Sequence, residues 1–278
     1  MRLFATLLLL AATAAAQKPT IFIITDGEGV AGMCRQDQVE PPSQELKQAL
    51  TGEVNAAVDG FLEGGAGEVI IWDGHDGSQT LSALTIHPKA KLVIGAIPAT
   101  MLMDRHFSAV AYIGQHSKAD IRGGIMAHSY SSLGIQNMLL NGKPVGEIDV
   151  IAAMAGLYNT PVIMLSGDKA AADELHEIVP QAETAVVKEG LARYTCISLS
   201  AEAARAAIHG AARRSMAKIG SIKPYTVPGP VTLQIEYTTR NSLPLDSESR
   251  PGAEVVDDRT IRFHGKDILE AWRLYRAR

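Results

Sequence analysis

A buried strand that stops at two closely spaced carboxylates constrains the fold most strongly. The unbroken apolar run Ile21–Ile24 is typical of a strand covered on both faces of a parallel sheet. Asp26 and Glu28 come soon after this run, and each is followed by a glycine. Ligands of open α/β sheets bind beyond the carboxyl ends of the strands, so both carboxylates are expected at the mouth of the sheet. Two carboxylates this close favour a metal site, whereas a helix N-cap followed by a solvated loop is the alternative.

The first sixteen residues have the three parts of a secretory signal. Arg2 supplies positive charge, Leu3–Ala12 is apolar, and Ala14–Ala16 fits a small-residue cleavage site. The apolar stretch is shorter than the roughly 20 residues that span a bilayer, which favours cleavage over a stable membrane anchor. We therefore expect residues 1–16 to be a signal peptide that is removed near Ala16, so that the mature chain begins near Gln17. The protein is then expected to be secreted or periplasmic.

Strands and helices alternate over residues 17–180. The expected elements are a helix over 43–63 and strands over 21–24, 68–72, 91–95, 109–114 and 162–165. This β-α-β order predicts an α/β domain built on a parallel sheet with right-handed crossovers. Residues 135–147 are expected to form a hairpin that leads into an apolar helix over 148–157.

From about residue 181 the pattern changes to that of a smaller α+β domain, which we expect over residues 181–278. The expected elements are strands over 184–188, 231–237 and 260–264 and helices over 201–218 and 267–275. Their order predicts antiparallel pairing. The stretch Pro224–Pro230 is expected to be a turn within this domain.

Five ligand-type side chains fall at the ends of elements in the first domain: Asp26, Glu28, His75, His116 and Glu147. Oxygen and nitrogen ligands that converge there could hold one or two divalent ions, with zinc or manganese fitting best. No single spacing among them is diagnostic. Taken alone, His75 and His116 would each more often be a surface histidine, or a core histidine with its hydrogen bonds satisfied, than a metal ligand.

Composition excludes some classes of partner and leaves others open. A formal net charge of −4 and the lack of a basic run argue against nucleic acid, while a small substrate remains compatible. Cys34 and Cys196 are the only cysteines, too few for a disulfide scaffold or a thiolate zinc site, and their distance in space is open.

In content and order, these motifs resemble the zinc-dependent D-aminopeptidase family, the peptidase M55 or DppA-like group, over essentially the whole mature chain. The matching pieces are Asp26-Gly-Glu28-Gly29 with Gly32, Asp73-Gly-His75, Gly114-Gln-His116, Ala127-His128-Ser129 and Pro144-Val-Gly-Glu147. The resemblance implies two zinc ions bridged by Asp26. It further implies that Glu28 and His116 complete one zinc site, that His75 and Glu147 complete the other, and that His128 is the catalytic histidine.

The resemblance also implies a Rossmann-like sheet with a smaller α/β domain, and a ring-shaped homo-oligomer, a decamer in the family, that encloses its active sites. The chain departs from the better-known members at three points. Glycine separates the two acidic ligands, Gln115 stands where those members have an aromatic residue, and a secretion signal precedes the domain.

The function expected from these features is an exported di-zinc aminopeptidase that releases N-terminal D-amino acids, such as D-alanine, from short peptides. Two alternatives remain open. One is a metal-dependent amidase or esterase that acts on another acyl substrate at the same site. The other is a non-catalytic metal-binding, ring-forming protein.

Overall fold

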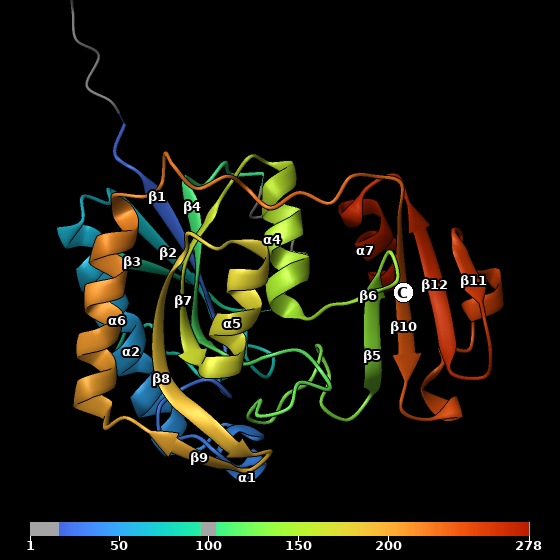
Figure 1. Cartoon of the computed structure of the whole chain (residues 1–278), viewed down its shortest axis with the longest axis horizontal. Helices are drawn as coiled ribbons and strands as arrows, with labels where there is room; N and C mark the ends of the chain where they lie inside the picture. The colour runs from blue at the N-terminus through green and yellow to red at the C-terminus, as the bar shows by residue number, and fades with distance from the viewer. Residues whose placement is uncertain (1–16, 96–103, 278) are drawn as a thin grey trace, which may run out of the picture.

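Two β-sheets form the framework of the chain in the computed structural model, which describes residues 17–95 and 104–277 (Figure 1). The expected signal peptide, residues 1–16, lies outside the described residues. The first sheet has seven strands, in the spatial order β3 (Ala90–Val93), β2 (Glu68–Trp72), β1 (Thr20–Thr25), β4 (Ala109–Gln115), β7 (Val162–Asp168), β8 (Glu183–Ala192) and β9 (Thr195–Ser198). All neighbouring pairs are parallel except β8 and β9, so the mainly parallel α/β fold is confirmed.

The second sheet is smaller and antiparallel. Its five strands are, in spatial order, β11 (Ala253–Val255), β12 (Thr260–Gly265), β10 (Val231–Tyr237), β5 (Ile135–Leu140) and β6 (Lys143–Pro144). Along β10 buried and half-buried residues alternate, because one face of the strand packs on the core and the other faces outward. This sheet lies to one side of the first (Figure 1).

Helices cover both faces of the first sheet. The helices in the described ranges are α1 (Gln36–Val39), α2 (Gln44–Glu63), α4 (Glu147–Leu157), α5 (Lys169–Ile178), α6 (Ala201–Met216) and α7 (Ile268–Arg276), with short 3-10 turns η1 (Arg240–Ser242) and η2 (Ser247–Ser249). Figure 1 shows α2 and α6 together on one side of the sheet and α4 and α5 on the other, while α7 lies against the second sheet. No helix in the described ranges is both long and apolar enough to cross a bilayer.

Helix α4 belongs to the cores of both sheets. Ile148, Ile151 and Ala155 pack into the core of the first sheet, whereas Val150 and Met154 pack into that of the second. The helix is apolar on every side, as expected for a helix surrounded by protein. It therefore holds the two sheets together, and the residue at its first position is fixed relative to both.

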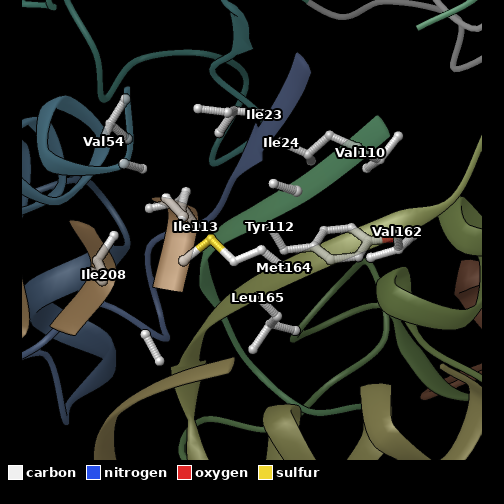
Figure 2. Close-up of a cluster of buried hydrophobic side chains, with 14 of the residues drawn as sticks. Ile23, Ile24, Val54, Val110, Tyr112, Ile113, Val162, Met164, Leu165 and Ile208 are labelled. Carbon is white, nitrogen blue, oxygen red and sulfur yellow. The ribbon is translucent and has the colours of Figure 1, made fainter. Parts of the chain in front are cut away.

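The central strands of the first sheet are apolar because both of their faces are covered. Figure 2 shows Tyr112 and Ile113 of β4 with Met164 and Leu165 of β7 among the buried side chains. The Tyr112 hydroxyl donates a 3.1 Å hydrogen bond to the carbonyl oxygen of Ile148. This bond connects β4 to the start of α4 and satisfies a polar group that would otherwise be costly to bury.

The sheets do not divide the chain between residues 180 and 181, where we expected the domain boundary. Strands β8 and β9 complete the first sheet because β8 pairs in parallel with β7. Strands β5 and β6 precede residue 180 but belong to the second sheet, where β5 pairs with β10.

The expected turn at Pro224–Pro230 is instead part of a segment that crosses from α6 to β10 over the end of α4 (Figure 1). Gly156 of α4 permits this crossing. A Cβ atom at Gly156 would lie 1.8 Å from the carbonyl oxygen of Tyr225.

Candidate metal centre

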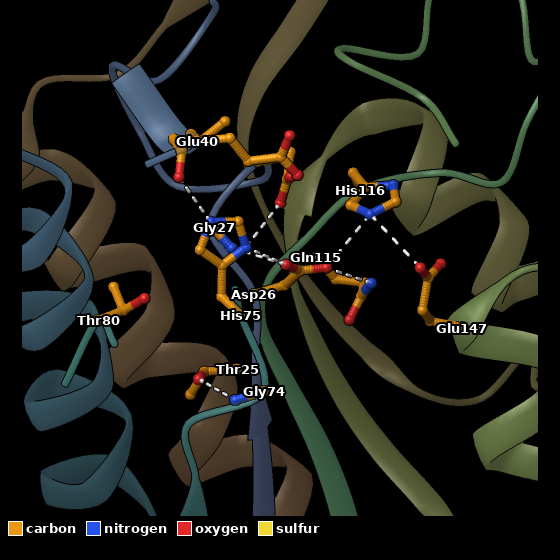
Figure 3. Close-up of polar contacts among 12 residues, drawn as sticks. Thr25, Asp26, Gly27, Glu40, Gly74, His75, Thr80, Gln115, His116 and Glu147 are labelled. Atoms are coloured by element: carbon orange, nitrogen blue, oxygen red, sulfur yellow. Dashed lines mark hydrogen bonds and ion pairs between the residues drawn. The ribbon is translucent and has the colours of Figure 1, made fainter. Parts of the chain in front are cut away.

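The carboxyl ends of three adjacent strands bring the five expected ligands together. Asp26 follows β1, His75 lies in the loop after β2, and His116 follows β4, and these three strands are neighbours in the sheet. Glu28 lies in the turn after β1, and Glu147 is the first residue of α4. Figure 3 shows the side chains of Asp26, His75, His116 and Glu147 gathered at this edge of the sheet.

Asp26 lies between the two histidines. Its Oδ1 atom is 3.0 Å from Nδ1 of His75, and its Oδ2 atom is 3.3 Å from Nε2 of His116. The other nitrogen of each ring faces a backbone carbonyl: Nε2 of His75 is 2.9 Å from the oxygen of Val39, and Nδ1 of His116 is 2.8 Å from that of Ser117. Because a carbonyl oxygen only accepts, these outer nitrogens carry hydrogen, and the inner nitrogens are free to bind a metal.

The remaining ligands divide into two groups around Asp26. Glu28 lies with His75, with 3.2 Å between Oε2 and Nδ1, and Glu147 lies with His116, with 3.9 Å between Oε1 and Nε2. Asp26, Glu28 and His75 each offer an atom within 4.8 Å of the others, as do His116, Glu147 and His128. This grouping differs from the pairing implied by the family resemblance, in which His116 accompanies Glu28 and His75 accompanies Glu147.

Three buried polar atoms at this centre accept or donate no hydrogen bond within the described part of the chain: Glu28 Oε2, His116 Nε2 and Glu147 Oε2. Buried polar atoms without partners are costly and rare, so their convergence calls for a ligand. Carboxylate oxygens and imidazole nitrogens are suitable ligands for a first-row divalent ion. The residues present therefore fit divalent metal binding, with two candidate groups of ligands and Asp26 between the two histidines.

The ionisation of these groups depends on their mutual contacts. Burial alone would raise the pKa of Asp26, but His116 and His75 outweigh it and hold that pKa well below its usual value. Burial would lower the pKa of His75, but Glu28 and Asp26 raise it to about 12. The pKa of His116 is likewise raised by Glu147 and Asp26. The three carboxylates thus favour a positive charge between them. Protonated histidines supply that charge here, and bound divalent ions would supply it as well.

The chain is similar to known proteins over most of its length. The family model of peptidase M55, described as D-aminopeptidase, matches residues 20–277. The chain belongs to the peptidase M55 family. A D-aminopeptidase of Bacillus subtilis (strain 168) is 29% identical over 259 residues, which cover 91% of this chain and 93% of that protein. A solved structure described as "Zn-dependent D-aminopeptidase DppA from Bacillus subtilis, a self-compartmentalizing protease" superposes with a TM-score of 0.84 at 28% identity, covering 92% of this chain and 95% of that one.

In this M55 chain, the sixth expected site residue, His128, lies with the other five. Its ring stacks on that of His116, with centroids 4.1 Å apart and 17° between the planes. Nδ1 of His128 faces the carbonyl oxygen of Met126 at 2.8 Å, so that nitrogen carries hydrogen and Nε2 is left to act in the cavity. His128 is also close enough to Glu147 to count as a possible ligand by distance alone.

A cavity of about 550 Å³ opens at the centre. Asp26, Glu28, His75, His128 and Glu147 face it from the metal side. Its other walls combine apolar side chains with small polar ones, among them Trp72, Tyr130, Ser131, Ser132, Leu133 and Ile151. The volume is that of a small-molecule site and suits a short peptide end.

Sequence reasoning missed the residues that support the Asp26–Glu28 turn of this M55 site. The buried Nζ of Lys188 donates to the backbone carbonyls of Glu28, Val30 and Met33. The buried Glu53 accepts from the backbone N–H of Ala31 at 2.9 Å. A lysine inside the apolar strand β8 and a glutamate on the buried face of α2 were the available signals.

Two further supports act beside them. Gln115 Nε2 donates to Asp26 Oδ2 at 3.0 Å, which orients the central carboxylate. Cys34, just beyond the turn, forms a disulfide with Cys196 of β9, a pairing that the sequence left open. Together with the contacts of Lys188 and Glu53, they fix the turn between β1, β4 and the β8–β9 hairpin.

Proposed function

We propose that the protein is an exported di-zinc D-aminopeptidase that releases N-terminal D-amino acids, such as D-alanine, from short peptides. The observation that carries the proposal is the position of the Asp26 carboxylate between His75 and His116, with Glu28 and Glu147 beside them. Buried atoms of Glu28, His116 and Glu147 that make no hydrogen bond in the described part of the chain lie at the same centre. Membership of the M55 family supports the reaction class. The description of the solved relative as zinc-dependent supports zinc as the metal.

Asp26, Glu28, His75, His116 and Glu147 would hold the metal ions. When bound, such ions acidify a water molecule and polarise the carbonyl of the scissile peptide bond. Glu28, His75 and His116 are buried and Asp26 and Glu147 are half-buried, which restricts the movement of the ligands. Gln115 orients Asp26 through its amide. The site thus resembles other hydrolytic centres in which the protein supplies placement and a dry, shaped cavity.

His128 would move the proton. Its Nδ1 hydrogen is committed to the Met126 carbonyl, so Nε2 is the atom available to take a proton from water or give one to the leaving amine. An imidazole suits this role because its ordinary pKa lies near neutrality. The backbone N–H of His128 donates to the carbonyl oxygen of Ser117 at 3.3 Å, which supports the stacking of its ring on that of His116.

The D configuration is supported by the descriptions of the relatives, and the preference for a small side chain such as that of alanine is supported by glycines that line the cavity. Gly74 and Gly77, in the loop that follows β2, line this cavity. Such walls favour a small substrate side chain.

Hydrolysis of D-alanyl and L-alanyl anilides, with and without chelator, tests the proposal. We expect chelator-sensitive turnover of the D form above that of the L form, with two zinc ions per chain by mass spectrometry. Turnover of other acyl anilides or esters in place of both would indicate a metal-dependent amidase or esterase. Bound metal without turnover would indicate a non-catalytic metal-binding protein.

Export is supported by the composition of residues 1–16 and by the Cys34–Cys196 disulfide, because disulfides persist in oxidising compartments. The intact mass of the exported protein should correspond to a chain that begins at or near Gln17. A retained Met1 would contradict cleavage.

We also propose a homo-oligomeric ring, a decamer if the family resemblance extends to assembly. The solved relative is described as self-compartmentalizing, which supports an enclosed assembly. Light scattering on the purified chain measures its mass in solution. A monomer would contradict the ring.

A further inference from the structure

The cavity has more carboxylates than the candidate metal centre uses. Five line it: Asp26, Glu28, Glu40, Asp76 and Glu147. No lysine or arginine lines it within residues 17–95 and 104–277. Asp26, Glu28 and Glu147 belong to the metal-binding groups, so Glu40 and Asp76 are left over. Asp76 is exposed, whereas Glu40 is half-buried, so the charge of Glu40 is less screened by water.

Neutral hydrogen bonds hold the side chain of Glu40 in place. Its Oε2 atom accepts from Nε2 of Gln36 at 2.7 Å and from the hydroxyl of Ser132 at 3.1 Å. Neither donor carries charge, and Glu40 has no ion-pair partner in the described part of the chain. Its Oε1 atom accepts no hydrogen bond there either. One oriented oxygen with an uncompensated negative charge is thus left for a ligand.

Glu40 also lies at a suitable place relative to the reacting groups. The carbonyl of the preceding residue, Val39, accepts the hydrogen bond from the metal-side histidine, His75. Figure 3 shows Glu40 next to His75 and Gly27. Its Ser132 contact reaches across to the loop that follows His128. The Glu40 carboxylate therefore lies at the cavity wall, between His75 of the metal centre and the loop that follows His128.

We infer that Glu40 binds the N-terminal ammonium group of the peptide substrate and so selects substrates with a free α-amino group. The inference rests on the proposed aminopeptidase function. An aminopeptidase has to distinguish a chain end from an internal peptide bond, and the ammonium is the feature that only the chain end carries. A charge-assisted hydrogen bond between ammonium and carboxylate provides that distinction. Glu40 is accordingly a specificity residue, with no role in metal binding.

Calorimetric titration of the zinc-loaded protein with D-alaninol tests the contact directly, because this probe has the ammonium and no bond to hydrolyse. Glu40→Gln should weaken D-alaninol binding roughly 10- to 100-fold, the usual range for loss of a charge-assisted hydrogen bond. N-acetyl-D-alaninol, which has no ammonium, should bind wild type and variant equally. Asp37→Asn removes a negative charge from α1, the short helix that ends directly before Glu40, at a position outside the cavity, and should leave D-alaninol binding unchanged.

Kinetics separate this inference from the proposed function. On D-alanyl anilide, Glu40→Gln should raise KM about 10- to 100-fold with kcat within a few-fold of wild type. On propanoyl anilide, which lacks the amine, the two proteins should be equal. Zinc content and thermal unfolding of Glu40→Gln should match wild type, since glutamine keeps an acceptor for Gln36 and Ser132.

Equal D-alaninol affinity in wild type and Glu40→Gln overturns the role of Glu40, even if wild type is an active D-aminopeptidase. Equal losses on the two anilides, or a loss of zinc, overturn it as well by assigning Glu40 a structural role. An inactive wild type whose D-alaninol binding still depends on Glu40 upholds the ammonium site and rejects the proposed hydrolysis.

Discussion

Asp26 directs its two carboxylate oxygens to different imidazoles, so one substitution there acts on both halves of the centre. Asp26→Ala should lose both metal ions, whereas His75→Ala should weaken mainly the ion held with Glu28. His116→Ala should weaken mainly the ion held with Glu147. Metal stoichiometry by mass spectrometry checks this. If the Asp26→Ala variant still bound two ions, the prediction that Asp26 contacts both metal ions would be wrong.

His128 is expected to act in catalysis and not as a required metal ligand. His128→Ala should keep its zinc and its fold and lose about 100- to 10,000-fold in kcat, the usual cost of removing a general acid–base group. Stopped assays with parallel metal analysis measure both quantities. Because His128 is within ligand distance of Glu147 and His116, zinc loss in this variant would reassign it as a ligand.

Glu53 should make stability depend on pH. Burial raises its pKa from 4.5 to about 7 despite the opposing Ala31 N–H and Lys188, so the folded protein holds this proton more tightly than the unfolded chain. Its contribution to stability is complete below about pH 4.5 and is lost as pH rises through 7. From pH 5 to pH 8, wild type should therefore lose about 2.5 kcal/mol more unfolding free energy than Glu53→Gln.

Urea unfolding of both proteins at several pH values measures this difference. Glutamine retains an acceptor for the backbone N–H of Ala31, so the turn after β1 should keep its contact. Parallel pH profiles for wild type and Glu53→Gln would show that Glu53 titrates normally.

At the scale of single residues, the sequence predicted the site where a ligand-type side chain stood at the end of a predictable strand. Asp26, His75 and His116 each follow a strand that the apolar pattern predicted, so their convergence could be expected. Lys188 could not be placed in the same way. Its partners lie more than 150 residues earlier in the chain, and only the pairing of β8 with β7 brings it beneath the turn.

At the scale of elements, the backbone of α4 comes very close to that of the crossing segment at Gly156 and Tyr225. Gly156→Ala should destabilise the protein by about 1–3 kcal/mol or more, because the new Cβ would overlap the Tyr225 carbonyl. Gly210→Ala on α6 is the matched control. Its Cβ would meet only the flexible Arg214 side chain, so better helix propensity should stabilise by about 0.5–1 kcal/mol.

Thermal unfolding of the two variants decides the matter, since their melting temperatures should move in opposite directions. A Gly156→Ala protein as stable as wild type would mean that the crossing segment adjusts freely to the added methyl group.

The elements themselves were largely predictable, and their assignment to sheets was not. Apolar runs located β1, β2, β4 and β7 because buried parallel strands have few polar residues. Local pattern does not reveal a strand's neighbours. The hairpin over β5 and β6 was expected as a local feature, yet its partner is β10, nearly a hundred residues later.

At the scale of the whole molecule, the Cys34–Cys196 disulfide closes a loop with a sequence separation of 162. A cross-link over so long a loop restricts the unfolded chain, so Cys196→Ser should lose about 2–5 kcal/mol of unfolding free energy. The denaturation midpoint measures this loss. Reductant should lower the midpoint of wild type to a similar extent and leave that of Cys196→Ser unchanged. Equal midpoints without reductant would mean that the disulfide does not stabilise the fold.

The position of the β5–β6 hairpin between His128 and Glu147 imposes an order in time on the nascent chain. A ribosome that adds 5–20 residues per second has made every candidate ligand once Glu147 is complete. The hairpin that joins His128 to Glu147 still lacks its neighbouring strand, because β10 begins only at Val231. Synthesis must therefore continue for several more seconds before the last ligand can be held in its final place. The metal-binding geometry seen in the structure can therefore form only after the chain has been synthesised through β10.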